Sequence, residues 1–219
     1  MADNTFNLSY TSARDDVLRM LPENARFVLD VGCSNGELGT SIKSLIGAQV
    51  HGIEIMPEMA RVAASRLDNV FTGGVEEAFH SESITAHRYD VIIFADVLEH
   101  LIDPWAILSK ATELLSPGGC IIASLPNIRH ISTLNNLIWK GYWPYRDRGI
   151  HDRTHLRFFT KKNILELFKQ ADLKIELIKT NYRIIEKPTR LNAVARFFAW
   201  PGLRNFLAYQ YLVRGRLKN

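Results

Sequence analysis

The sequence has only two cysteines, Cys33 and Cys120, and no apolar run approaching the ~18 residues that a membrane-spanning helix requires. Both cysteines stand in apolar, strand-like stretches, so we expect reduced, buried thiols rather than a disulfide framework. The first residues, Met1 to Asn4, provide neither a basic region nor an apolar stretch, so we expect no signal peptide. These absences predict a cytoplasmic protein.

Acidic residues are absent from the C-terminal part of the chain. From Lys187 onward there are seven Lys or Arg residues and no Asp or Glu, whereas the net charge of all 219 residues is only +4. The 47% of hydrophobic residues is enough for one sizeable domain with additions. We therefore predict a mildly acidic domain at residues 1–186 and a basic tail at 187–219. An acidic domain argues against a nucleic-acid partner.

One stretch follows the order strand, tight turn, helix. Residues 27–31 are apolar except for Asp30, residues 32–36 read Gly-Cys-Ser-Asn-Gly, and a helical pattern follows. Glycine at such a turn lets the backbone pass close to a ligand, and the helix start offers unpaired N–H groups. A second apolar run ends at Glu54, 22 residues after Gly32. An acid at the tip of the second strand can accept hydrogen bonds from both hydroxyls of a ribose.

The segment Asp30-Val31-Gly32-Cys33-Ser34-Asn35-Gly36, together with Glu54, resembles the Asp-x-Gly-x-Gly-x-Gly motif of class I S-adenosylmethionine-dependent methyltransferases. Ser34 replaces the middle glycine of that motif. Nucleotide dehydrogenases share the acid but usually carry Gly-x-Gly-x-x-Gly. Two later segments extend the resemblance over roughly residues 10–178: Asp96 to Leu101, and Leu-Leu-Ser-Pro-Gly-Gly ending at Gly119.

The resemblance implies an α/β fold with a doubly wound, mostly parallel, seven-stranded Rossmann-like sheet, and the alternation of strands and helices agrees with it. It also implies S-adenosylmethionine as the cofactor. The residues that would bind it are Asp30, Gly32, Cys33, Ser34, Gly36, Glu54, Ile55, Glu76 and Asp96, with Glu77 as an alternative to Glu76. Tyr10 and Arg14, on a helix expected at residues 10–21, either join them or belong to a helix that only packs.

An insertion at residues 128–159 follows the fifth expected strand, at the sheet edge where ligands bind. Its second half is rich in aromatic, arginine and histidine residues, which is typical of a substrate cover. If the acceptor is a hydroxyl, a general base must take its proton, and a histidine can be neutral near pH 7. We predict His155, or failing that His151, as the catalytic base. The alternative is that either histidine only orients the loop.

The blocks at 126–130, 141–143 and 152–160 resemble a bacterial subgroup near the methionine-biosynthesis W proteins and the methyltransferases of surface-polysaccharide pathways. This favours O-methylation of a small-molecule or glycan-linked hydroxyl. A quinone or phenol acceptor and a non-catalytic accessory protein are the alternatives. Asp96, Glu99 and His100 resemble a cluster that binds a divalent ion in some ubiquinone-pathway O-methyltransferases. We predict no metal, because Val-Leu-Glu-His-Leu is common in methyltransferases without one.

The tail carries six aromatic residues between Leu191 and Val213, interrupted by Pro201-Gly202, and its charged residues are all basic. This composition predicts two short helices that contact anionic lipid on the inner membrane face. The alternative is that the apolar side of the tail packs on the core or on a second subunit, as in a homodimer.

Overall fold

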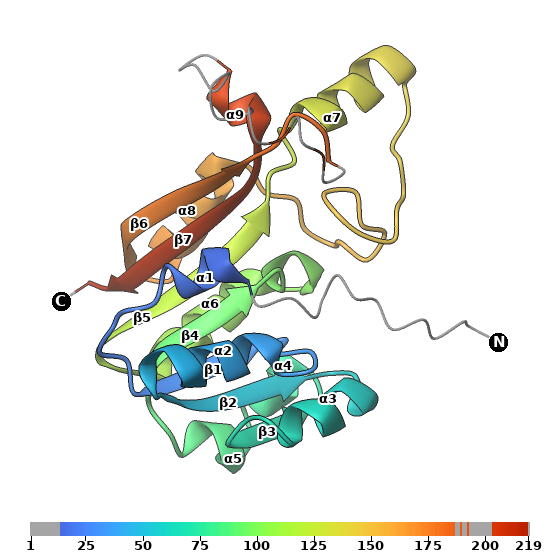
Figure 1. Ribbon diagram of the computed structural model, residues 1–219. Helices are drawn as coiled ribbons and strands as arrows, with labels where there is room; N and C mark the ends of the chain where they lie inside the picture. The colour runs from blue at the N-terminus through green and yellow to red at the C-terminus, as the bar shows by residue number, and fades with distance from the viewer. Residues whose placement is uncertain (1–13, 187–188, 190–191, 193–202, 219) are drawn as a thin grey trace. The chain divides into compact units, whose positions relative to one another are not determined.

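The computed structural model describes residues 14–186, 189, 192 and 203–218. Seven strands form a mixed sheet with the hydrogen-bonding order β3-β2-β1-β4-β5-β7-β6 (Figure 1). The strands are β1 (Phe27–Val31), β2 (Gln49–Glu54), β3 (Asn69–Thr72), β4 (Tyr89–Ala95), β5 (Leu115–Pro126), β6 (Leu173–Tyr182) and β7 (Ala208–Leu217). The predicted α/β class with seven strands is confirmed.

The helices alternate with the strands along the chain. They are α1 (Asp15–Leu18), α2 (Glu37–Ile46), α3 (Pro57–Ala64), α4 (Val75–Ala78), α5 (Glu82–Thr85), the 3₁₀ turn η2 (Leu98–His100), α6 (Pro104–Glu113), α7 (Ile131–Leu134), the π-helical η3 (Asn135–Trp139), α8 (Lys161–Gln170) and α9 (Arg204–Leu207).

Local signals set the ends of several of these helices. Gly47 ends α2 in the left-handed conformation, at φ 66°. Pro57 opens α3, and Thr160 forms a capping box with Asn163 at the start of α8. The Asp103 carboxylate accepts a hydrogen bond from the backbone N–H of Ala106 at 3.0 Å, which caps α6. Short-range chemistry therefore fixes these boundaries as the sequence predicts.

The chain divides into two compact units, and β5 passes from one into the other. The first unit comprises residues 1–95 and 110–122, and the second comprises 96–109 and 123–219. In the first unit, β1 lies parallel between β2 and β4. Val28, Leu29, Ile92 and Ile93 on these strands are completely buried. An unbroken apolar run such as residues 91–95 of β4 is typical of a strand covered on both faces.

In the second unit, β7 pairs antiparallel with β6 over nearly its whole length, from Leu173 opposite Leu217 to Tyr182 opposite Ala208 (Figure 1). Residues 208–217 were predicted to belong to a helical tail, and this prediction is wrong. Within the described segment 203–218, only Arg204–Leu207 are helical, and residues 193–202 lie outside the described part. This segment forms a strand rather than a helix because Tyr211, Leu212 and Val213 are buried in the sheet, where aromatic and β-branched residues pack well.

The basic residues of β7 are also used within the sheet. Arg214 and Arg216, two positions apart and hence on one face, both contact the carboxylate of Glu176 on β6, at 3.1 and 2.6 Å. Two of the seven basic residues that were expected to meet lipid therefore pair with an acid on the neighbouring strand instead. Among the helices of the described residues, none has the length and apolar character to cross a membrane.

Candidate functional site

The glycine-rich turn closes back onto β2. The N–H groups of Gly32 and Cys33 both donate to the carbonyl of Ile53, at 2.8 and 3.0 Å. Ser34, the residue that replaces the family's middle glycine, has φ 50°, in the left-handed region that glycine prefers. The turn therefore keeps the shape that a glycine would give it, at a cost of ~1–2 kcal/mol for a residue with a side chain.

Glu54 stands at the end of β2 and is nearly buried. Its Oε2 accepts a hydrogen bond from the N–H of Ser34 at 2.8 Å, and its Oε1 accepts one from the N–H of Met56 at 2.9 Å. A carboxylate offers about four acceptor positions, so each oxygen can accept one more hydrogen bond. Two neighbouring hydroxyls of a ribose are donors that match this arrangement.

Asp30 on β1 is the second acid of the turn and is only 1% exposed. Neither of its carboxylate oxygens has a hydrogen-bond partner among the residues that the structure describes. Burial raises the pKa of Asp30 to about 7; the charge of Glu54 adds to this rise and the charge of Arg14 opposes it. A buried carboxyl without partners is costly, and a ligand with a cationic or hydrogen-bond-donating group would relieve that cost. The turn thus fits a nucleoside that also carries an ammonium group.

The other predicted cofactor residues of the first unit have varied surroundings. Arg14 forms an ion pair with Asp16 at 3.0 Å, and Tyr10 lies outside the described residues. Ile55 and Glu76 are exposed. The thiol of Cys33 is buried, and burial raises its pKa, so it packs as a neutral group.

Asp96 directly follows β4 in the chain and belongs to the second unit. It too has a left-handed backbone, with φ 59°. Its Oδ1 accepts hydrogen bonds from the hydroxyl of Ser124, at 3.0 Å, and from the side-chain amide of Gln210. Gln210 lies on β7, 114 residues away in the chain, so this partner is not predicted from the sequence. No local pattern could have found it.

The second unit also contains an open hollow of about 570 Å³, lined by Ile128, Trp143, Tyr145, Arg153, His155 and Phe158. Aromatic rings dominate this lining. Trp143 and Phe158 meet edge to face, with ring centroids 5.3 Å apart. The predicted cover at 128–159 therefore forms a concave surface suited to a flat, apolar group.

His155 contributes its ring to this hollow. Its Nδ1 lies 3.2 Å from the carbonyl oxygen of Ile150, and its Nε2 lies 4.0 Å from Oε1 of the buried Glu99. If Nδ1 carries the proton that is shared with Ile150, Nε2 is the basic nitrogen. Burial lowers the pKa of His155, and the charge of His100 lowers it further, so the ring is neutral near pH 7. This geometry suits a general base.

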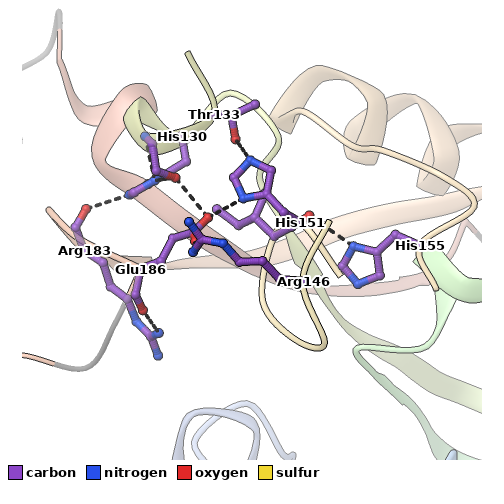
Figure 2. Close-up of polar contacts among 9 residues, drawn as sticks. His130, Thr133, Arg146, His151, His155, Arg183 and Glu186 are labelled. Atoms are coloured by element: carbon purple, nitrogen blue, oxygen red, sulfur yellow. Dashed lines mark hydrogen bonds and ion pairs between the residues drawn. The ribbon is translucent and has the colours of Figure 1, made fainter. Parts of the chain in front are cut away.

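His151 has a different environment (Figure 2). It is completely buried, with Nε2 3.1 Å from the hydroxyl of Thr133 and Nδ1 2.7 Å from a carboxylate oxygen of Glu186. The rings of His151 and Trp143 meet edge to face, with their centroids 5.1 Å apart. Both ring nitrogens are engaged and solvent does not reach them, so the geometry favours the alternative in which His151 orients the loop.

Three residues whose side chains can bind a metal ion also lie close together at the hollow. Ligand atoms of Glu99, His100 and His155 all lie within 4.8 Å of one another. This set differs from the sequence-based alternative, which combined Glu99 and His100 with Asp96. One carboxylate and two imidazoles suit a divalent transition metal. The same three residues also make protein contacts; the Nδ1 of His100, for example, lies 3.0 Å from the hydroxyl of Thr154.

The sheet order, the glycine-rich turn after β1 and the acid at the end of β2 define a class I methyltransferase fold. A family model described as a methyltransferase domain matches residues 7–178, and the chain belongs to this family. The predicted class of protein is thereby confirmed. The comparisons do not confirm the predicted glycan-pathway subgroup.

Two of the relatives are named ubiquinone biosynthesis O-methyltransferase. The one from Xanthomonas axonopodis pv. citri is 38% identical over 130 residues, which cover 57% of this chain and 50% of that protein. The one from Nitrosospira multiformis is 32% identical over 168 residues, covering 73% and 68%. The chain spans about half to two thirds of the length of the first relatives.

A solved structure with a similar fold is magnesium protoporphyrin IX methyltransferase from Synechocystis PCC 6803 with bound SAH. Its TM-score is 0.63 at 16% identity, and the similarity covers 96% of this chain and 84% of that one. At this identity, the likeness concerns the fold.

Proposed function

We propose that this protein transfers a methyl group from S-adenosylmethionine to a hydroxyl of an aromatic acceptor of the phenol or quinol type. Family membership and the similar fold solved with SAH support S-adenosylmethionine as the cofactor. The names of the relatives favour an aromatic hydroxyl over the glycan-linked acceptor expected from the sequence.

The residues that line the hollow support an aromatic acceptor rather than a sugar. Three of its six residues are aromatic and a fourth is Ile128, whereas its polar side chains besides Tyr145 are Arg153 and His155. A flat ring can stack on or abut such walls and leave one hydroxyl for a polar partner. A sugar exposes several hydroxyls, and a wall with few polar groups would leave most of them without a hydrogen bond.

Each residue has a defined task in this proposal. Glu54 holds the ribose hydroxyls, and Asp30 holds the ammonium group of the cofactor. When bound, the cofactor supplies a sulfonium-activated methyl group, so the protein mainly has to align the reactants and exclude water. Nε2 of His155 accepts the proton of the acceptor hydroxyl. The carboxylate of Glu99, 4.0 Å away, stabilises the imidazolium that results.

The test is turnover on matched acceptors. Catechols and hydroquinols are compared with free and nucleotide-linked sugars, and S-adenosylhomocysteine and the methylated product are both quantified. We expect methylation of the aromatic compounds alone. His155→Ala should slow turnover by ~10²–10⁴-fold and leave cofactor affinity unchanged. Methylation of sugars but not phenols would reject the acceptor class, and absence of any turnover with bound cofactor would favour an accessory protein.

A metal-assisted form of the same reaction is the second candidate, favoured by the close approach of Glu99, His100 and His155. A divalent ion there could bind an acceptor oxygen and lower the pKa of its hydroxyl. Exhaustive chelation followed by addition of Mg²⁺, Mn²⁺ or Zn²⁺ separates the two forms. Full activity after chelation rejects the metal and leaves His155 as a simple base.

A further inference from the structure

Glu186 is a buried acid that the proposed reaction does not use. Only 9% of it is exposed, and it lies four residues beyond the end of β6. Its carboxylate contacts three side chains. Ser132 donates its hydroxyl at 3.0 Å. Nδ1 of His151 lies 2.7 Å away, and the guanidinium of Arg146 pairs with Oε2 (Figure 2). One carboxylate therefore joins the start of α7, the insertion loop and the segment after β6.

The charge of Glu186 is maintained by these partners. Burial alone would raise the pKa of Glu186, but the hydrogen bond and charge of His151 and the charge of Arg146 hold it below its ordinary value. Its backbone carbonyl also accepts a hydrogen bond from Arg183 at 3.0 Å. Removing one member of such a buried cluster leaves the others unpaired.

Two contacts lead from this cluster to the hollow. The ring of His151 packs on Trp143, which lines the hollow. The neighbouring residue, Ile150, offers its carbonyl oxygen to Nδ1 of His155 at 3.2 Å. The turn is also closed on itself, because the N–H of Arg146 donates to the carbonyl of His151 at 2.9 Å. Glu186 thus contacts both Arg146 and His151, which lie on the two sides of the turn that precedes His155, the proposed base.

We propose that Glu186 is a positioning residue, which holds the turn at residues 146–155 so that His155 and Trp143 keep their places at the hollow. This inference rests on the proposed function, since it assumes His155 as the base. In this proposal Glu186 affects the binding and reaction of the acceptor only. Cofactor binding, which depends on Asp30 and Glu54, is independent of it.

Glu186→Gln keeps the shape of the side chain and removes its charge. The matched control is Glu176→Gln, because the carboxylate of Glu176 also pairs with arginine side chains, those of Arg214 and Arg216, but within the β6–β7 pair. Displacement of a catalytic group by ~1 Å can slow a reaction about 100-fold. We therefore expect kcat of Glu186→Gln to fall ~10–100-fold and the acceptor KM to rise, with an unchanged cofactor Kd. Glu176→Gln should match the wild type in all three.

A double-mutant cycle shows whether Glu186 acts through His155. In the His155→Ala background, Glu186→Gln should lower kcat no further, because there is no base left to position. Losses that multiply independently would overturn the inference, and so would an unchanged kcat and KM in Glu186→Gln. If Glu186→Gln does not fold, Ser132→Ala is measured instead, and a change of less than about twofold in kcat/KM overturns the inference.

A measurement without any acceptor separates this inference from the proposed function. Side-chain ¹⁵N NMR of the seven histidines, assigned by single substitutions, reports the ring state of each. Glu186→Gln should shift the signals of both His151 and His155, whereas Glu176→Gln should shift neither. An unchanged His155 signal overturns the positioning role even if phenols are methylated. A shifted signal without turnover on phenols supports the positioning and rejects the proposed acceptor.

Discussion

Asp30 should make the unliganded protein less stable at neutral pH than at acidic pH. Its pKa is about 7 in the folded protein, compared with an ordinary value of 3.8. The folded state therefore holds the proton more tightly than the unfolded state, so this residue's contribution to stability falls as the pH rises from about 4 to about 7. A shift of ~3 units corresponds to about 4 kcal/mol.

The perturbation is Asp30→Asn, which has nearly the same shape and cannot ionise. Its buried amide has a cost of its own, about 1–3 kcal/mol, but that cost does not depend on pH. The change in relative stability between pH 4.5 and pH 8 therefore isolates the ionisation of Asp30. We expect the variant to gain about 3 kcal/mol over the wild type across this interval, because most but not all of the shift falls within it, and to bind S-adenosylmethionine more weakly.

The assay is urea unfolding followed by circular dichroism, without cofactor, at several pH values. Asp68→Asn is the control with the opposite sign. Burial opposes ionisation of Asp68, but hydrogen bonds from Lys43 and from the N–H of Val50 hold its pKa below the ordinary value. Its contribution is therefore present throughout pH 4.5 to 8 and is lost only as the pH falls below the ordinary value of 3.8, so Asp68→Asn should parallel the wild type across this interval. If the wild type and Asp30→Asn show parallel stability curves from pH 4.5 to 8, the reasoning about Asp30 is refuted.

Three further predictions concern the turn and β7. Glu54→Ala should lose ~2–3 kcal/mol of cofactor binding free energy, the worth of a charge-assisted pair of hydrogen bonds, and calorimetric affinity equal to the wild type would contradict the ribose role. Ser34→Gly should raise stability by about 0.5–1 kcal/mol, because it relieves the left-handed strain against a smaller entropic cost, with cofactor affinity retained; a lower melting temperature would oppose this. A chain ending at Pro188 should lose the fold of the second unit, because β7 is removed; a cooperative melt like that of the full chain would show that β7 is dispensable.

The glycine-rich turn could be predicted because its signals are local. An acid, a spaced pair of glycines and a second acid at the next strand end all lie within 25 residues of one another, and sterics leave such a turn few conformations. Ser34 shows the strength of this constraint, since the turn keeps its shape after the glycine is replaced. Helix ends at Gly47, Pro57 and Thr160 were predictable for the same reason.

The remaining features depend on contacts between distant segments. Residues 208–217 combine aromatics and arginines in an order that suits an interfacial helix or a strand, and only pairing with β6 decides between them. The spacing of His151 and His155 in the sequence likewise could not show which of the two has which role. Burial against Thr133 and Glu186 distinguishes them, and these partners lie 18 and 35 residues from His151.

The hydrogen bond from Gln210 to Asp96 has a consequence for the order in which the protein matures. Translation proceeds at ~5–20 residues per second, so the 114 residues between these two positions take on the order of ten seconds to make. During that interval the glycine-rich turn and both of its acids have already been synthesised. β7, whose Gln210 donates a hydrogen bond to Asp96, has not. The residues of the glycine-rich turn are therefore synthesised well before the strand that fixes the acidic residue after β4.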